Sequence, residues 1–384
     1  MGIAQRYSQF EQRSFYSYLY VSSQQHLTVA FRKNDMDLKM QHIHIPQWMI
    51  QGVTGNFVFF VFLSIFFVIF TSSFCIGNYD ISITQVVKIF AAKIFPIQQD
   101  WPNSMETVIF KVRMPRILGA SLVGSALAMA GTAYQAMFKN PLVSPDILGA
   151  SSGAGTGAAL AIFLSFGIVG IQVMSFTLGL AAVMLAYGIS IKIPKDRALA
   201  LVLTGIIVGT LFSSGTSLLK YLSDPYDELP TITFWLMGSL STTSSHDVFI
   251  VLFPILVGTI MLSISRWQIN VMSLSEDEAK SLGVETGKLR FVAIVSSTLV
   301  TSASVSISGM VGWVGLLIPH LARMLAGPDF PTLLPISALL GASYLVLVDD
   351  IARCAASVEI PLGVLTSIIG APFFLLLLCR QKGG

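Results

Sequence analysis

Residues Leu274–Arg290, LSEDEAKSLGVETGKLR, carry seven charged side chains in a chain of which only 11% of the residues are charged. The segment lies between two long apolar runs. An ionised side chain at the centre of a membrane helix costs about 2.5–3.5 kcal/mol on insertion scales. We therefore expect the segment to lie in water or against a soluble partner, and the apolar runs on either side of it to cross a membrane.

The same segment has the signals of a short helix. Ser275 followed by Glu278 forms the S-x-x-E capping box, which satisfies free backbone N–H groups at a helix start. Three successive acids stand at the positive end of the helix dipole, and Gly283 is a typical helix stop. These signals predict a helix of about two turns, and the alternative interpretation is a plain solvated connector.

Composition indicates an integral membrane protein. Of the 384 residues, 54% are hydrophobic, and the mean hydropathy is +0.74, whereas a soluble domain has about 45–50% apolar residues even with glycine included. Three scattered cysteines do not form a disulfide framework, and the pair His42 and His44 lacks a third metal ligand. We expect no metal site and no nucleic-acid surface.

Ten apolar runs predict an all-α membrane protein with about ten transmembrane helices, since about 20 residues cross a bilayer. Their cores are Phe57–Phe70, Ile117–Met137, Ile147–Phe166, Val169–Ile191, Leu199–Leu219, Val248–Ile264, Phe291–Ile307, Val311–Leu325, Leu333–Val348 and Val364–Leu378. Residues 1–54 precede them as a polar N-terminal extension, and residues 55–380 form one transmembrane domain. Pro319 and His320 interrupt the eighth run and predict a broken helix there.

Basic residues predict the orientation. An even number of spans puts both termini on one side, and if that side is cytoplasmic, most of the 23 Lys and Arg lie inside. The charged segment that contains Ser275 is then cytoplasmic. The exception is KVRMPR, in which Lys111, Arg113 and Arg116 lie outside. Either these long side chains extend to the lipid headgroups, or they form a cationic patch for an acidic partner or an anionic ligand.

Glycine spacing predicts where helices cross closely. Gly149, Gly153 and Gly157 recur every four residues on one helix face, and Gly205 and Gly209 repeat the spacing in the fifth span. We expect tight packing there, around a translocation path. The sequence GVETGKL has too few residues between its glycines, and the wrong residue after its lysine, for a Walker A loop. We therefore expect the chain to bind no cofactor and not to hydrolyse ATP by itself.

Charged residues inside spans are candidates for function. Asp349 and Arg353 are four residues apart, which suits an ion pair on one helix. A proton or ion relay through Asp349, Asp350 and His320 is an alternative, and it would make the chain a secondary transporter that needs no nucleotide. A receptor or scaffold without transport is a third class, and it leaves the glycine faces unexplained.

Five segments resemble the FecCD permeases, which are the membrane subunits of ABC importers for iron siderophores, haem, cobalamin and related metal chelates. They are VRMPRILGASLVGSALAMAGTAYQAMFKNPLVSPDILGASSGAGTGAAL (112–160), FWLMGSLS (234–241), SLSEDEAKSLGV (273–284), GMVGWVGLLIPHLARMLAGPD (309–329) and VDDIARCAASVEIPLGVLTSIIGAPFF (348–374). The resemblance covers residues 55–380, and the motifs occur in the family's order and spacing. Within the family, the chain resembles the permeases of type II importers, such as the vitamin B12 permease. The N-terminal extension is longer than the family pattern.

The resemblance implies a multi-pass protein of the inner membrane of a prokaryote. Its implied partners are a second permease subunit, identical or different, two cytoplasmic ATPase subunits that bind ATP and Mg, and an external substrate-binding protein. The charged segment corresponds to the coupling helices that fit a cleft in each ATPase. The residues carried over for this contact are Ser275, Glu278, Ala279, Leu282, Gly283 and Val284.

Three arginines, Arg113, Arg116 and Arg353, resemble the basic residues that receive acidic side chains from the two lobes of the binding protein. Asp350 departs from the family pattern, because it adds a second acid that weakens the positive charge around Arg353. The resemblance implies a transport subunit rather than an enzyme, working by alternating access. An iron chelate is expected on family frequency, and cobalamin, haem or an oxyanion are the alternatives.

Overall fold

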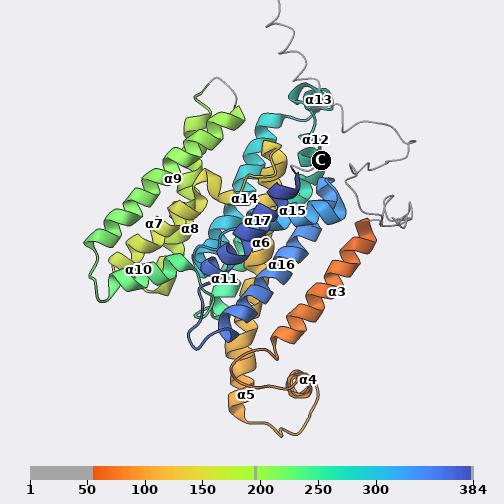
Figure 1. Cartoon of the computed structure of the whole chain (residues 1–384), viewed down its shortest axis with the longest axis vertical. Coiled ribbons are helices and arrows are strands. Elements are labelled where there is room, and N and C mark those ends of the chain that lie inside the picture. Colours follow the sequence, from red (N-terminus) through yellow and green to blue (C-terminus); the bar gives the residue numbers. More distant parts are fainter. Residues whose placement is uncertain (1–54, 194–196, 382–384) are drawn as a thin grey trace, which may run out of the picture. The chain divides into compact units, whose positions relative to one another are not determined.

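Residues 55–193 and 197–381 are described by a computed structural model, in which all regular secondary structure is helical (Figure 1). Ten helices coincide with the ten expected spans: α3 (Gly55–Ser73), α6 (Met114–Phe138), α7 (Ala150–Phe163), α8 (Ile168–Ser190), α9 (Arg197–Leu222), α11 (Ser245–Ile264), α14 (Thr286–Ser308), α15 (Val314–Ala326), α16 (Phe330–Cys354) and α17 (Leu362–Gln381). Shorter helices connect them: α4 (Ile83–Ala91), α5 (Asn103–Thr107), the π-helix η1 (Val108–Arg113), the 3₁₀ helix η2 (Pro145–Leu148), α10 (Glu228–Met237), α12 (Arg266–Val271) and α13 (Glu276–Ser281). The N-terminal extension 1–54 lies outside the described residues.

The all-helical fold is confirmed, whereas ten membrane crossings stay a prediction. Within the described part of the chain, six helices are long and apolar enough to cross a membrane: the continuous helix Asn103–Phe138, α8, α9, α11, α14 and α16. The apolar parts of α3, α15 and α17 are shorter. The 14 residues of α7 span about 21 Å, less than the roughly 30 Å of a hydrocarbon core.

One expectation about the local backbone was wrong. The eighth span is not broken at Pro319, because α15 continues through it. The irregular backbone lies earlier, where Gly309 and Trp313 have φ of 65° and 68° and separate α14 from α15. The KVRMPR sequence is helical, since η1 and α6 run on continuously from α5.

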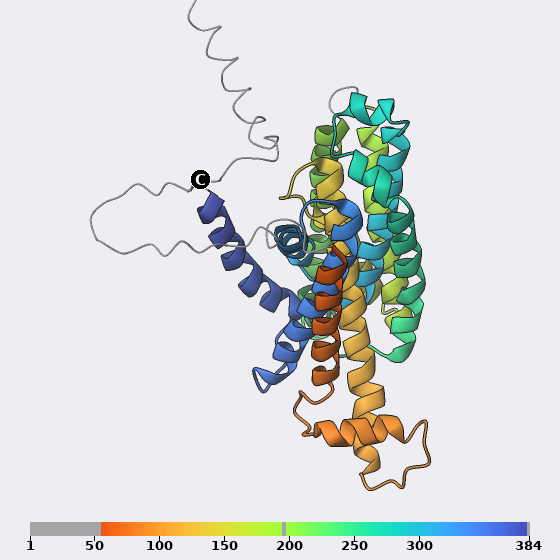
Figure 2. The ribbon, with the colours of Figure 1, turned by 90° about the vertical axis from the view of Figure 1, so that its right-hand side faces the viewer.

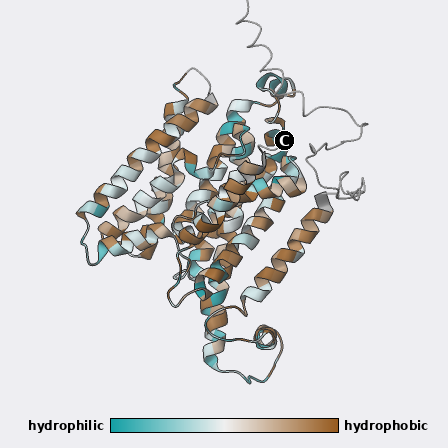
Figure 3. Ribbon diagram, viewed as in Figure 1, coloured by the Kyte–Doolittle hydropathy of each residue, from teal (hydrophilic) through white to brown (hydrophobic). Residues whose placement is uncertain are grey.

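The long helices alternate in direction between two ends (Figures 1 and 2). The α13 end holds α12, α13 and the last turn of α6, and the α4 end holds α4, α5 and the last turn of α3. Hydrophobic residues follow the long helices between these ends, and hydrophilic residues gather at α13 (Figure 3). This distribution matches a bundle whose middle lies in hydrocarbon.

At the centre of the bundle, α6 packs against α14, α15 and α16 at very short range. A Cβ atom added at Gly124 would lie 2.2 Å from the carbonyl oxygen of Gly341 in α16. One added at Gly131 would lie 1.8 Å from the carbonyl oxygen of Gly315 in α15. Backbones approach this closely only where both helices lack side chains, which is the packing typical of membrane helices.

The glycines singled out from the sequence also lie at helix crossings. Cβ atoms added at Gly153 and Gly157 would lie 2.5 and 2.2 Å from carbonyl oxygens of α8. Gly149, with φ of 86°, starts α7 against Gly205 and Gly209 of α9. These residues therefore hold α7 between α8 and α9, and their place along a translocation path stays a prediction.

We expect Gly131→Ala to destabilise the bundle. The added methyl group must push α15 away from α6, and overpacking of this kind costs about 1–3 kcal/mol. Gly188→Ala in α8 is the matched control, because nothing lies within 4 Å of a Cβ atom there. Thermal unfolding in detergent measures both, and equal melting temperatures for the two variants would contradict the packing argument.

Candidate functional site

The charged segment forms the capped helix that its sequence predicts. The Ser275 side chain accepts a hydrogen bond from the Glu278 backbone N–H, and Glu278 Oε2 accepts hydrogen bonds of 2.9 Å from both the backbone N–H and the hydroxyl of Ser275. The helix stops at Gly283, whose φ is 78° and whose N–H donates to the Lys280 carbonyl. The capping box and the glycine stop are confirmed, and the helix itself, Glu276–Ser281, has six residues.

The six residues carried over for the ATPase contact divide into two sets. Ala279 and Val284 are buried in a hydrophobic cluster with residues of α6, α12 and α14, so they attach α13 to the bundle. Ser275, Glu278, Leu282 and Gly283 are exposed. Leu282 is an apolar side chain with 53% of its surface in contact with solvent. An exposed leucine on a short charged helix is a typical contact for another protein.

A polar cavity of about 930 Å³ lies beside α13, between the last turn of α6 and the first turn of α14. Its charged lining residues are Lys139, Glu276, Lys280, Glu285 and Arg290. Arg290 donates to Glu276 over 3.1 Å, which ties the start of α13 to α14. The α13 end therefore presents a charged recess with an apolar contact at its edge.

The capping box makes α13 sensitive to acid. Hydrogen bonds from the Ser275 backbone and hydroxyl lower the pKa of Glu278. Because the folded-state pKa is depressed, this stabilisation is present above the ordinary pKa of a glutamate and is lost as pH falls through the lowered value. We expect the α13 amides to lose hydrogen-exchange protection over this acidic range, and Glu278→Gln to weaken that pH dependence. Glu285→Gln, which leaves the capping box intact, is the control, and identical profiles for the two variants would contradict this role.

At the α4 end, Arg116 is the centre of a buried ion-pair cluster. Its Nε donates to both carboxylate oxygens of Asp349 over 2.9 Å, and its Nη1 donates to Glu359 over 2.8 Å. Arg116 is 5% exposed and Asp349 is 1% exposed, whereas the Glu359 side chain is 43% exposed. The cluster joins α6, α16 and the segment between α16 and α17.

Two further arginines extend the cluster to the end of α3. Arg353 pairs with Asp350 and donates to the Ser73 hydroxyl over 2.6 Å, and Ser73 in turn donates to Asp350 over 2.6 Å. The Asp349 carboxylate is 3.8 Å from Arg353 Nε, so the pair expected on one helix is weaker than the pair with Arg116. Arg113 donates to the backbone carbonyls of Phe74 and Tyr79.

The structure thus brings the three predicted docking arginines together but encloses them. Arg113, Arg116 and Arg353 are 3%, 5% and 7% exposed, where an open cationic patch was expected. The reason is that the chain supplies its own partners: the acids Asp349, Asp350 and Glu359 for Arg116 and Arg353, and two backbone carbonyls for Arg113. The docking role stays a prediction. Glu359 was not singled out from the sequence, although the motif that contains it was. Its partner Arg116 lies 243 residues away along the chain, and such a contact leaves no local signal in the sequence.

The residues of the alternative ion relay are not connected. His320 lies within α15, and among the described residues it makes no hydrogen bond or ion pair with Asp349 or Asp350. Both aspartates are engaged by arginines at the α4 end. No group of three His, Cys, Asp or Glu side chains that could hold a metal is present in residues 55–193 and 197–381, and His42 and His44 lie outside them.

Known proteins with similar sequences are membrane permeases, which agrees with a bundle of apolar helices. The family model of the FecCD transport family matches residues 65–380. A molybdate import system permease protein of Haemophilus influenzae is 43% identical over 310 residues, which are 80% of this chain and 91% of that protein. A cobalamin import system permease protein of Halobacterium salinarum is 38% identical over 74% of this chain and 76% of that protein.

A solved structure shares the architecture. It is described as an inward-facing conformation of an ABC transporter of the metal-chelate type, and it aligns with a TM-score of 0.76 and 39% identity over 84% of this chain and 99% of that chain. The family match runs from the second half of α3 into α17, and it includes the buried arginine cluster and the charged segment with α13. This chain therefore belongs to the FecCD transport family and is a membrane permease subunit of an ABC importer, a transport component rather than an enzyme.

Proposed function

We propose that this chain is one of two permease subunits that enclose a translocation path, with two separate ATPase subunits bound at the α13 end. The observation that carries the proposal is α13, a capped helix that exposes Leu282 beside a charged recess. In this proposal the α13 end and both termini are cytoplasmic, which agrees with the positive-inside rule. ATP and Mg bind to the ATPases and not to this chain.

The packing of α13 supports a mechanism of force transfer. Ala279 and Val284 attach α13 to a cluster that includes Leu289 and Ile294 of α14, and α14 packs along α6, α8 and α11. A displacement of α13 by the ATPases is therefore passed to α14 and α6, the two most buried of the long apolar helices that the structure describes. ATP biases the inward-facing and outward-facing states only if the α13 contacts differ between them. Uptake by proteoliposomes that contain the permease without its ATPases would contradict this proposal.

For the substrate, we propose a metal oxyanion of the molybdate type, because the relative with 43% identity over 91% of its length is a molybdate permease. An iron chelate, favoured by family frequency, is the second candidate, and the metal-chelate transporter with the same fold supports it. Titration calorimetry on the cognate binding protein separates them. We expect binding of molybdate but not of sulfate, and binding of a ferric siderophore, haem or cobalamin instead would overturn the first choice.

We further propose that the binding protein docks at the α4 end, and that Glu359 stays paired with Arg116 until the binding protein docks. The support is the unequal burial of the two acids on Arg116: Asp349 is enclosed, whereas Glu359 is partly exposed. An acidic side chain of the binding protein can replace Glu359 without unpairing Asp349. Arg113 stays bound to backbone carbonyls and Arg353 to Asp350 and Ser73, so these two arginines fix the backbone around the docking surface.

The exchange of acids has a direct test. Glu359→Gln removes the competing charge, so we expect tighter docking of the cognate binding protein in a pull-down or by surface plasmon resonance. Glu106→Gln is the control, because Glu106 is also partly exposed at the α4 end but pairs with Lys93. Weaker docking by Glu359→Gln would contradict the exchange, and unchanged docking after charge reversal of Arg116 in a folded variant would remove this residue from the interface.

A further inference from the structure

The helix α4 lies at the end of the molecule opposite α13 and begins at a capping box formed by Ser82 and Gln85. Helical hydrogen bonding continues past its last residue, because the Phe95 N–H donates to the Ala91 carbonyl over 2.8 Å. Figure 2 shows α4, in orange, lying across the direction of α3 and α6 and beyond the last turn of α3. A helix in this orientation runs parallel to the surface of a membrane that the long helices cross.

One face of α4 is apolar and largely uncovered. Four apolar residues are spaced by four, three and four positions, which places them on the same side of a helix: Ile83, Val87, Phe90 and Ile94. Ile83, Val87 and Ile94 are 65%, 62% and 80% exposed, and Phe90 is half-buried. Single exposed apolar residues are normal, whereas a row of them on one face indicates a contact surface. We call these four residues the α4 apolar face.

The α4 apolar face is turned toward the end of α3. The ring of Phe90 packs edge-to-face against the ring of Phe74, the residue that follows α3, with the ring centroids 5.3 Å apart. Phe74 packs in the same manner against Phe70 of α3, at 5.6 Å. The outer side chains of α3, such as Phe67 and Val68, are exposed and apolar, as expected for a helix in lipid. The α4 apolar face therefore points toward the hydrocarbon, and the part of it that α3 does not cover is open to lipid.

The other sides of α4 agree with this orientation. Val86 and Ile89 are buried in a hydrophobic cluster with residues of η1, so they attach α4 to the bundle. Thr84 and Lys88 lie on the side away from the apolar face and are exposed, and Lys88 pairs with Asp100. Helices that lie in a membrane surface have this arrangement, with apolar residues toward the acyl chains and polar residues toward water.

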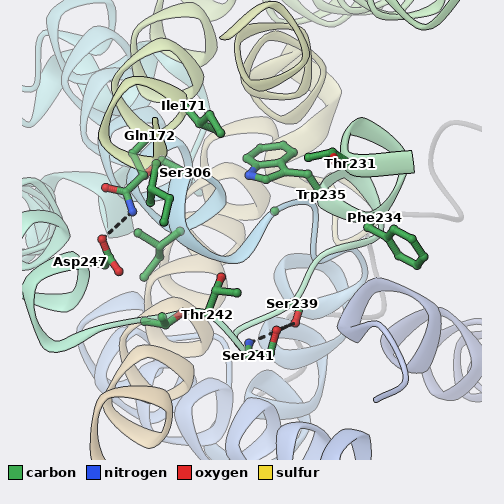
Figure 4. A pocket seen from close by; sticks show the side chains of 14 residues that line it. Ile171, Gln172, Thr231, Phe234, Trp235, Ser239, Ser241, Thr242, Asp247 and Ser306 are labelled. Atoms are coloured by element: carbon green, nitrogen blue, oxygen red, sulfur yellow. Dashed lines mark hydrogen bonds between the residues drawn. The ribbon is translucent and has the colours of Figure 1, made fainter. Parts of the chain in front are cut away.

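Polar side chains of other helices mark the membrane surface at the same end of the molecule. Near the starts of α8 and α11, Gln172 donates to Asp247 over 2.7 Å, and Ser239 pairs with Ser241 in the segment before α11 (Figure 4). Such groups avoid the middle of a bilayer and gather where a span meets water. The buried arginine cluster lies at this end too. Because α4 contacts the residue that follows α3, it lies at the level of the lipid headgroups.

We propose that α4 is an interfacial helix, which inserts the α4 apolar face into the bilayer leaflet at its own end of the molecule. The partner is the lipid surface rather than one particular headgroup, because the lysines of α4 and of the turn after it are already neutralised. Lys88 pairs with Asp100, and Lys93 pairs with Glu106. The α4 apolar face itself carries no charge, so its contact depends on apolar burial and not on attraction to anionic lipid.

The lipid contact of α4 holds the connection between α3 and α6 in place. In this connection the backbone carbonyl of Tyr79 accepts a hydrogen bond from Arg113. A fixed α4 therefore also fixes one partner of the arginine cluster. The proposal rests on the membrane location of the family, and it depends neither on the imported substrate nor on where the binding protein docks.

Spin labels on the two sides of α4 test this orientation. The native cysteines are first removed by Cys75→Ser, Cys354→Ser and Cys379→Ser, and one cysteine is then introduced by Val87→Cys or by Thr84→Cys and labelled with a nitroxide. The permease with its ATPases is reconstituted in proteoliposomes of phosphatidylethanolamine and phosphatidylglycerol. Collisions with molecular oxygen, which concentrates in lipid, and with a water-soluble nickel chelate are measured by power saturation. We expect oxygen to dominate at position 87 and the nickel chelate at position 84.

Val87→Asp tests whether the α4 apolar face inserts as a unit. The new charge stands where the face meets lipid, so α4 should leave the bilayer and a label introduced by Ile94→Cys should lose its contact with oxygen. Thr84→Asp is the matched control, because it adds the same charge on the polar side and should leave the label at position 94 unchanged. Val87 and Thr84 are both exposed, so neither change disturbs the core, and assembly with the ATPases verifies folding.

Two results would overturn the proposal. Equal access of the nickel chelate to the labels at positions 87 and 84 would place both sides of α4 in water. A label at position 87 that the nickel chelate reaches in proteoliposomes, and that becomes protected only after the cognate binding protein is added, would assign the α4 apolar face to the binding protein instead of the lipid.

Discussion

Replacing Arg116 by methionine is expected to destabilise the permease by about 3–5 kcal/mol, the usual cost of leaving one partner of a buried ion pair without the other. Asp349 is 1% exposed, and the next nearest cation is Arg353, whose Nε lies 3.8 Å away and whose Nη2 pairs with Asp350. Methionine preserves most of the side-chain volume of Arg116, so the change removes charge rather than packing. Thermal unfolding and the yield of folded protein in detergent measure the effect.

Lys111→Met is the matched control for this variant. It removes one positive charge three residues before Met114, where Lys111 is exposed, and a surface change of this kind is usually within about 0.5 kcal/mol. The double variant Arg116→Met with Asp349→Leu should recover much of the loss, since neither charge of this pair is then left buried without its partner and Glu359 can turn to water. A melting temperature for Arg116→Met equal to that of Lys111→Met would show that the cluster does not stabilise the fold.

Replacing Gly283 by proline is expected to abolish ATP-driven uptake while ATP hydrolysis by the partner subunits continues. Gly283 has φ of 78°, whereas proline requires a φ near −65°, and the N–H that binds the Lys280 carbonyl is lost as well. The turn that ends α13 must therefore rearrange, and Leu282 moves from its place at the edge of the recess. Uptake of labelled substrate and phosphate release, measured in the same proteoliposomes, separate the two activities.

Two variants show which property of the turn matters. Gly283→Ala keeps the N–H donor and adds a Cβ atom with nothing within 4 Å, so only the strain of the positive φ, about 1–2 kcal/mol, opposes it. We expect a smaller loss of uptake. Leu282→Asp leaves the backbone unchanged but removes the apolar contact, and it should resemble Gly283→Pro. Normal uptake by both Leu282→Asp and Gly283→Pro would exclude α13 as the coupling element.

Features set by local chemistry were predictable from the chain. The ten apolar runs became ten helices, and Ser275, Glu278 and Gly283 cap and stop α13 as expected, because capping and helix termination depend on residues within one turn of each other. The prediction of a broken helix at Pro319 was wrong for the complementary reason, because tertiary packing overrode a local preference. A proline lowers the propensity of the segment around it, but packing against α6 and α16 maintains α15 through it.

The sequence by itself determined a helical membrane bundle, its charged segment with a capped helix, and its family. The tertiary structure alone decided that Arg116 and Arg353 are buried against the chain's own acids and Arg113 against backbone carbonyls, that Glu359 shares Arg116, and that Gln172 meets Asp247. The physical reason is the separation along the chain between the residues that interact. Hydropathy and capping depend on neighbouring residues, whereas the exposure of a charge depends on a partner that, for Arg116 and Asp349, lies 233 residues away and comes close only when α6 and α16 pack.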